Sequence, residues 1–196
     1  SGSNFAKADR AVSLLDHGFN VAMLSYRGHS NNPGQACQKT IIKDVVSGIE
    51  ALVKEGYGVD QIHLEGSSLG TAVLAHAISR IYQKLGSENQ FASLVLKAAP
   101  LNIYEGDKDT VESLKTAGLE YEQALPFLRK LWNQEEVYSQ VKAKQITIVH
   151  GTCDDVVPVE HAHKIKAILD RRNENVILKI IEGEGHRLGL SEYGVF

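Results

Sequence analysis

A serine flanked by glycines carries the strongest chemical signal in this sequence. Gly66, Ser67, Ser68, Leu69 and Gly70 come directly after a predicted strand and directly before a predicted helix, and only Ser68 lies at the centre of a G-x-S-x-G motif. Such a motif forms a tight strand-to-helix turn, in which the serine backbone is strained and the glycines relieve crowding. The pattern predicts that Ser68 is a nucleophile. The alternative is a glycine-rich turn whose serine caps the helix.

A serine hydroxyl needs a base and a group that orients the base, and both residue types follow downstream. Asp154 comes after an apolar run that ends at residue 149, and His186 lies in a glycine-rich loop after the last apolar run. Serine, acid, histidine is a known chain order for such sites. We therefore expect Ser68, His186 and Asp154 to form a catalytic triad. Asp154 is preferred to Asp155, although the two aspartates could instead form a turn and cap the helix that begins near residue 159.

The other histidines and the two cysteines do not follow the pattern of a metal site. His161 and His163 lie two residues apart on a predicted helix, so they face different sides of it. His150 is expected to have a structural hydrogen-bonding role. Cys37 and Cys153 are too few for a disulfide framework or a zinc site, and as free thiols they favour a reducing compartment. No metal and no cofactor are predicted.

Composition and charge exclude several classes of protein. The apolar fraction of 43% and the charged fraction of 23% are ordinary for a folded domain, and 196 residues suffice for one domain. A net charge of −3 provides no basic face for nucleic acid. The apolar runs fall far short of a membrane span, so no transmembrane segment is predicted within the sequence. A cytoplasmic location is expected, and the sequence is also compatible with a targeting segment upstream of Ser1.

Alternating strand and helix patterns must position the reactive residues. Apolar residues recur at helical spacing in four segments, and five short apolar runs between them read as strands. The runs at 92–98 and 145–149 are apolar at consecutive positions, which is typical of interior strands of a parallel sheet. The expected helices are one between Asn4 and Gly18, and 37–54, 69–85 and 159–170. The expected strands are 19–25, 61–65, 92–98, 145–149 and 176–181.

Residues 101–144 interrupt this alternation with helix-like patches. We expect a small helical cap there, inserted into a single domain whose core comprises residues 1–100 and 145–196. Several large apolar side chains in the segment suggest an apolar lid and an apolar acyl group in the substrate, although packing on the core explains them equally well. They are Tyr121, Leu125, Phe127 and Trp132.

Taken together and in order, the motifs resemble those of the α/β-hydrolase superfamily, in particular the serine aminopeptidase S33-like and BEM46-like hydrolases. The matching residues are Tyr26-Arg27-Gly28, the turn at Ser68, His150-Gly151 with Asp154 and Val157-Pro158, and Gly185-His186. The resemblance implies an α/β-hydrolase fold, a mostly parallel sheet with helices on both faces. It also implies a serine hydrolase that cleaves an ester-like acyl bond of a small molecule. Peptidase, thioesterase, lipase and acyltransferase activities stay open, as does a non-catalytic binding protein of this fold.

The resemblance further implies two donors to an oxyanion, the Leu69 N–H and an N–H of Ser1 or Gly2. Ser1-Gly2-Ser3-Asn4 looks like the end of the family's oxyanion loop, although Ser1 and Gly2 could equally be a remnant of purification. In the family a strand lies between those expected here at 19–25 and 61–65. A sheet without it has unpaired edges. We therefore expect the first strands to be missing from this sequence and to be supplied by an additional N-terminal segment or another chain.

Overall fold

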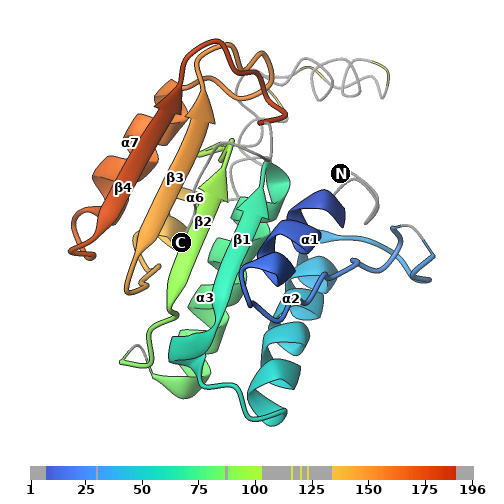
Figure 1. The fold of residues 1–196 in the computed structure, drawn as a ribbon. Coiled ribbons are helices and arrows are strands. Elements are labelled where there is room, and N and C mark those ends of the chain that lie inside the picture. The colour runs from blue at the N-terminus through green and yellow to red at the C-terminus, as the bar shows by residue number, and fades with distance from the viewer. Residues whose placement is uncertain are drawn as a thin grey trace.

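A parallel sheet forms the centre of the molecule. The computed structural model describes residues 8–29, 31–86, 88–102 and 134–188, together with residues 116, 120 and 123. Four strands pair in parallel in the order β1-β2-β3-β4 (Figure 1). They are β1 (His63–Ser67), β2 (Ser93–Lys97), β3 (Ile146–Gly151) and β4 (Val176–Ile181). Four of the five expected strands are thereby confirmed.

Helices cover both faces of this sheet. Figure 1 shows α1 on one face, beside β1, and α3 and α7 on the other, with α2 packed against α3. The helices are α1 (Ala8–Asp16), α2 (Gln38–Lys54), α3 (Leu69–Leu85), α6 (Gln134–Tyr138) and α7 (Glu160–Leu169), and a short 3-10 turn, η2 (Val59–Gln61), precedes β1. Within the described ranges, none of the helices combines the length and the apolar character needed to cross a membrane.

The main core lies between the sheet and the α3 and α7 layer. Every residue of β2 and β3 is buried, which explains why their sequences are apolar at consecutive positions. Leu96 and Ile148 face the main core, whereas Val95 and Val149 form a smaller cluster on the other face. The two central strands are thus covered on both sides.

A partly buried ion-pair cluster joins α1 to the sheet. Arg10 Nη2 lies 2.9 Å from Glu65 Oε2, and Lys97 Nζ lies 2.6 Å from Glu65 Oε1. Burial by itself raises the pKa of Glu65, but the two cations outweigh it and lower the pKa below its usual value. No residue of α1 is buried, and the side chains of Val12 and Leu15 are exposed. The helix is therefore held to the sheet by charge more than by apolar packing.

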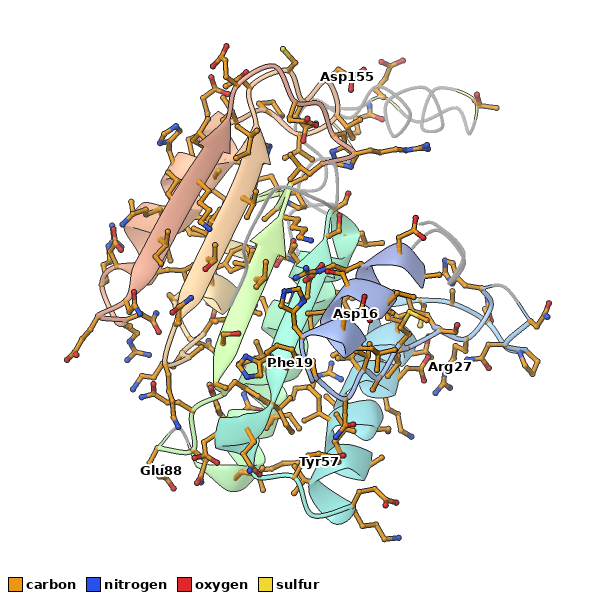
Figure 2. All side chains as sticks on the ribbon, viewed as in Figure 1. Asp16, Phe19, Arg27, Tyr57, Glu88 and Asp155 are labelled. Atoms are coloured by element: carbon orange, nitrogen blue, oxygen red, sulfur yellow. The ribbon has the colours of Figure 1, made fainter. Side chains whose placement is uncertain are left out.

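The predicted strand at 19–25 is wrong. The segment is not a strand and has no ladder partner among the described residues, and Met23 and Leu24 are exposed. Phe19 contacts the His63 ring edge-on, with 5.3 Å between ring centroids, and Phe19 is labelled beside β1 in Figure 2. A strand requires a neighbour that pairs with its backbone, and the described residues provide none for this segment.

Most of the expected cap lies outside the described residues, including Tyr121, Leu125, Phe127 and Trp132. Its described C-terminal part packs on the core. Tyr138 of α6 is fully buried, and its hydroxyl donates to Thr71 Oγ1 of α3 at 3.3 Å. Ala143 forms an isolated parallel bridge with Phe91. The boundaries of the cap stay a prediction.

Candidate active site

The turn at Ser68 joins β1 directly to α3. Ser68 has φ 52° and ψ −126°, a conformation that costs a non-glycine residue about 1–3 kcal/mol. A Cβ on Gly66 would lie 2.7 Å from Leu74 Cδ1 and 2.9 Å from the Gly70 carbonyl oxygen, so only glycine fits there. The expected strained turn is present, and the close approach of Gly66 to Gly70 makes it possible.

Hydrogen bonds hold this strained residue in place. The Ser68 amide donates to the Lys97 carbonyl of the neighbouring strand at 2.9 Å, and the Thr71 amide and hydroxyl both donate to the Ser68 carbonyl. Ala98, directly after β2, also has positive φ, at 46°. Within the described residues, these two are the non-glycine residues with positive φ, and both lie at the carboxyl edge of the sheet. Backbone strain concentrates at this edge.

The side chains of Ser68, His186 and Asp154 meet at the same edge. His186 Nε2 lies 3.0 Å from Ser68 Oγ, and His186 Nδ1 lies 2.9 and 3.0 Å from the two carboxylate oxygens of Asp154. An ionised carboxylate only accepts, so Nδ1 carries the hydrogen and Nε2 can accept from the serine hydroxyl. This arrangement can remove a proton from Ser68 and stabilise the imidazolium that results.

Asp154, and not Asp155, contacts the histidine. The side chain of Asp154 is 1% exposed, and its Oδ1 accepts the amides of Val156 and Val157 at 3.0 and 2.8 Å. Asp155 is exposed and is labelled in Figure 2 on the loop beyond the carboxyl ends of the strands. Asp154 forms a turn as well as the histidine contact, so the two interpretations of this residue are compatible. The residue before α7 is Val159, without a side-chain cap, so neither aspartate caps that helix.

The loop that carries His186 is tied to the loop after β3. The Cys153 amide donates to the Glu184 carbonyl at 2.8 Å, and the Gly183 amide donates to Thr152 Oγ1 at 2.9 Å. A Cβ on Gly151 would lie 2.5 Å from the Glu184 carbonyl carbon and still closer to its oxygen. Glycine at position 151 therefore lets the two loops approach closely enough for Asp154 and His186 to meet.

Leu69 begins α3, so its amide belongs to the helix N-terminus beside Ser68, where partial positive charge gathers. Leu69 as a whole residue is 38% exposed. This position is suited to an oxyanion formed at Ser68. The family resemblance implied Ser1 or Gly2 as the second donor, and both residues lie outside the described residues.

Other titratable groups lie in different surroundings. His63 Nδ1 pairs with Ser93 Oγ at 2.8 Å, and His161 Nδ1 accepts the Leu101 amide at 3.0 Å. Burial, with a smaller effect of Arg80, lowers the pKa of His76 to about 4. In the described part of the chain, no group of three or more histidine, cysteine or acidic side chains could hold a metal ion.

The two cysteines are exposed and form no disulfide. Cys37 precedes α2, and a hydrogen bond from the Thr40 side chain is the main cause that lowers the pKa of its thiol.

Two features of the site escaped sequence reasoning. His150 has the expected structural hydrogen bond, but its Nε2 also lies 3.2 Å from Asp154 Oδ2, and the sequence did not suggest this proximity. The Arg10, Glu65 and Lys97 cluster was likewise not anticipated. The available signals were a histidine four residues before the acid and a lysine in an otherwise apolar run.

Solved hydrolase structures share this fold. A monoacylglycerol lipase of Paleococcus ferrophilus matches with a TM-score of 0.66 and 15% identity, over 92% of this chain and 80% of that chain. An esterase of Pyrococcus furiosus matches with a TM-score of 0.66 and 21% identity, over 91% and 66%. The parallel sheet, the helices on both faces and the serine turn define an α/β-hydrolase fold. The predicted fold class and the resemblance to this superfamily are confirmed.

The chain belongs to the prolyl oligopeptidase family, whose model matches residues 6–195. Human protein ABHD12B is 27% identical over 191 residues, which cover 90% of this chain and 49% of that protein. The Arabidopsis thaliana alpha/beta hydrolase domain-containing protein WAV2 is 28% identical over 162 residues, covering 79% and 50%. The chain thus spans about half the length of these relatives. The finer likeness to S33-like and BEM46-like hydrolases stays a prediction.

Proposed function

We propose that this chain is a serine hydrolase that cleaves an ester-like acyl bond of a small molecule through an acyl-enzyme on Ser68. The observation that carries the proposal is a chain of two hydrogen bonds. One joins Ser68 Oγ and His186 Nε2, at 3.0 Å, and the other joins His186 Nδ1 and Asp154. A serine hydroxyl without such a base is a poor nucleophile at neutral pH. The burial of Asp154 against three donors of the surrounding loops is consistent with an orienting role.

In the first step, Ser68 Oγ attacks the substrate carbonyl carbon while His186 Nε2 takes the hydroxyl proton. The oxyanion accepts a hydrogen bond from the Leu69 amide and from a second donor, assigned to Ser1 or Gly2 by the sequence resemblance. The tetrahedral intermediate then breaks its bond to the leaving alcohol, which receives the proton from His186. Loss of one oxyanion donor costs on the order of a hundredfold or more in turnover, so both donors matter.

In the second step, His186 removes a proton from water, which attacks the acyl-enzyme carbonyl. The new intermediate expels Ser68 Oγ, which regains its proton from His186, and the acid leaves. Throughout, Asp154 keeps His186 in the tautomer that has its proton on Nδ1 and stabilises the imidazolium. No metal or cofactor enters either step.

A peptidase is the second candidate, because the family model that matches the chain is that of the prolyl oligopeptidases. An ester is preferred because lipase and esterase structures match most of the chain, with TM-scores of 0.66. An acylaminoacyl peptidase of Pyrococcus horikoshii matches with a TM-score of 0.56 over 76% of this chain. Aryl esters of increasing chain length, one thioester and one aminoacyl anilide, assayed side by side, separate these activities.

The experiment that tests the proposal is labelling with a fluorophosphonate probe. The parent and Ser67→Ala should both be labelled, whereas Ser68→Ala should not. Ser67 is a matched control, because it is the adjacent serine and lies at the end of β1. Labelling of Ser68→Ala equal to that of the parent would end the proposal. A folded parent that neither reacts with the probe nor hydrolyses any substrate would instead favour the non-catalytic binding protein.

A further inference from the structure

His150 is a buried histidine directly beside the proposed triad. It is the next-to-last residue of β3, and its side chain is fully buried. Its Nε2 lies 2.9 Å from the Val157 carbonyl oxygen and 3.2 Å from Asp154 Oδ2. The mechanism proposed above does not use this ring.

The two neighbours of Nε2 determine where the ring carries its hydrogen. A backbone carbonyl and an ionised carboxylate are both acceptors, so Nε2 must be the protonated nitrogen. Nδ1 is buried and has no hydrogen-bond partner within the described residues. A second hydrogen on Nδ1 would be a buried donor without an acceptor, which is costly. The contacts therefore assign the neutral ring with its hydrogen on Nε2.

The contact between His150 and Val157 bears directly on Asp154. The Val157 amide donates to Asp154 Oδ1 at 2.8 Å, while the Val157 carbonyl accepts from His150. His150 thus holds the Val157 end of this turn through the Val157 carbonyl. The Asp154 end of the turn carries the carboxylate. The Nε2–H group of His150 also faces Oδ2 of the Asp154 carboxylate, the oxygen that His186 contacts.

We infer that His150 is a positioning residue for Asp154: its Nε2–H fixes the turn that presents the carboxylate to His186 and places a neutral dipole against that carboxylate. The inference rests on the proposed function and extends it by one residue. His150 touches neither Ser68 nor a reacting atom, so it acts through Asp154.

In the described part of the chain, the titratable groups to consider at this contact come from the triad and from α7. Asp154 and His186 lie against it, and α7, which packs on β3, contributes Glu160 and His161 in its first turn. Lys97 and Lys179 are register partners of Val149, so they point to the opposite face of the sheet from His150. The dipole of His150 therefore acts mainly on the Asp154 and His186 pair.

Two amide variants form a matched test. The amide nitrogen of His150→Gln reaches the position of Nε2, whereas that of His150→Asn reaches only the position of Nδ1. We expect His150→Gln to stay within a few-fold of the parent kcat, and His150→Asn to lose about tenfold or more with KM unchanged, because a small misplacement of a catalytic group is costly.

Equal losses in both variants, or a parental kcat in His150→Asn, would overturn the inference. If the variants do not fold, nitrogen-15 NMR of the parent imidazoles decides it. The expected spectrum at about pH 7 assigns the hydrogen of His150 to Nε2 and none to Nδ1, and a hydrogen on Nδ1 would contradict the inference. Because the NMR readout needs no activity, it still decides the His150 contact if the probe fails to label Ser68 and the proposed function falls.

Discussion

Replacement of Gly151 by alanine should separate the two loops that bring His186 and Asp154 together. The added Cβ would lie 2.5 Å from the Glu184 carbonyl carbon, whereas ordinary van der Waals contact begins at 3.4 Å. The Glu184 backbone must therefore retreat by at least about 0.9 Å, the difference between these distances. Glu184 is two residues before His186, and its carbonyl also accepts the Cys153 amide.

A displacement of this size is large compared with the tolerance of the site. Added to the 3.0 Å between His186 Nε2 and Ser68 Oγ, it takes the pair beyond hydrogen-bond distance. A misplacement of about 1 Å costs on the order of a hundredfold in rate. We expect Gly151→Ala to lose that much kcat/KM on a short-chain aryl ester, and to unfold at a lower temperature than the parent.

Gly185→Ala is the control for this prediction. It adds the same methyl group one residue before His186, but its Cβ would lie 3.6 Å from the Cys153 carbonyl oxygen, an ordinary contact. We expect this variant to stay within a few-fold of the parent. Parental activity in Gly151→Ala, or equal losses in the two variants, would refute the reasoning that close loop contact positions the histidine.

Three further predictions concern the frame around the site. Glu65→Gln leaves the cations of Lys97 and Arg10 without their carboxylate, so the free energy of unfolding in urea at neutral pH should fall by about 3 kcal/mol. Because the pKa of Glu65 is lowered in the folded protein, ionised Glu65 stabilises the fold at neutral pH. This contribution to the free energy of unfolding is lost as pH falls below the usual carboxyl range. The pKa of His76 is lowered from 6.5 to about 4, so between these values the unfolded state binds more protons and stability falls as pH drops. His76→Gln should flatten that dependence in urea titrations. Finally, if another segment or chain completes the sheet at β1, the β1 amides that do not face β2 should exchange with solvent quickly in this chain alone and slowly once the added strand is present.

Each of these predictions has an outcome that contradicts it. Unchanged stability of Glu65→Gln would mean that the cluster does not anchor α1. A His76→Gln variant with the pH dependence of the parent would assign that dependence to another group. Slow exchange at the free side of β1 in this chain alone would show that the edge is already protected.

The approach of the site residues to one another was predictable, because strand patterns that alternate with helix patterns indicate a parallel sheet. The carboxyl ends of parallel strands share one edge, so residues on the loops that follow β1, β3 and β4 were expected to lie near one another. The choice between Asp154 and Asp155 was harder, because neighbouring residues on a loop differ only in the direction of their side chains. The turn formed through the amides of Val156 and Val157 decides which one faces the histidine.

Features that depend on distant partners were not predictable in the same way. Residues 19–25 have the apolar content of a buried strand, but a strand forms only where a neighbour accepts its hydrogen bonds, and none is present in the described residues. Val12 and Leu15 have helical spacing, yet they are exposed, and Arg10 ties α1 to Glu65 of the sheet instead. The position of His150 beside Asp154 depends on how the loop after β3 folds back onto that strand. The pattern of apolar and polar residues in the sequence does not predict the path of this loop.

Trapping of the acyl-enzyme tests the central claim most directly. The parent protein, quenched in acid during turnover of a slowly hydrolysed aryl ester, should gain the mass of one acyl group. Peptide mapping should locate that group on Ser68, and Ser68→Ala should show no added mass. An acyl group mapped to any other residue during turnover, or turnover that persists in Ser68→Ala, would contradict the proposed chemistry.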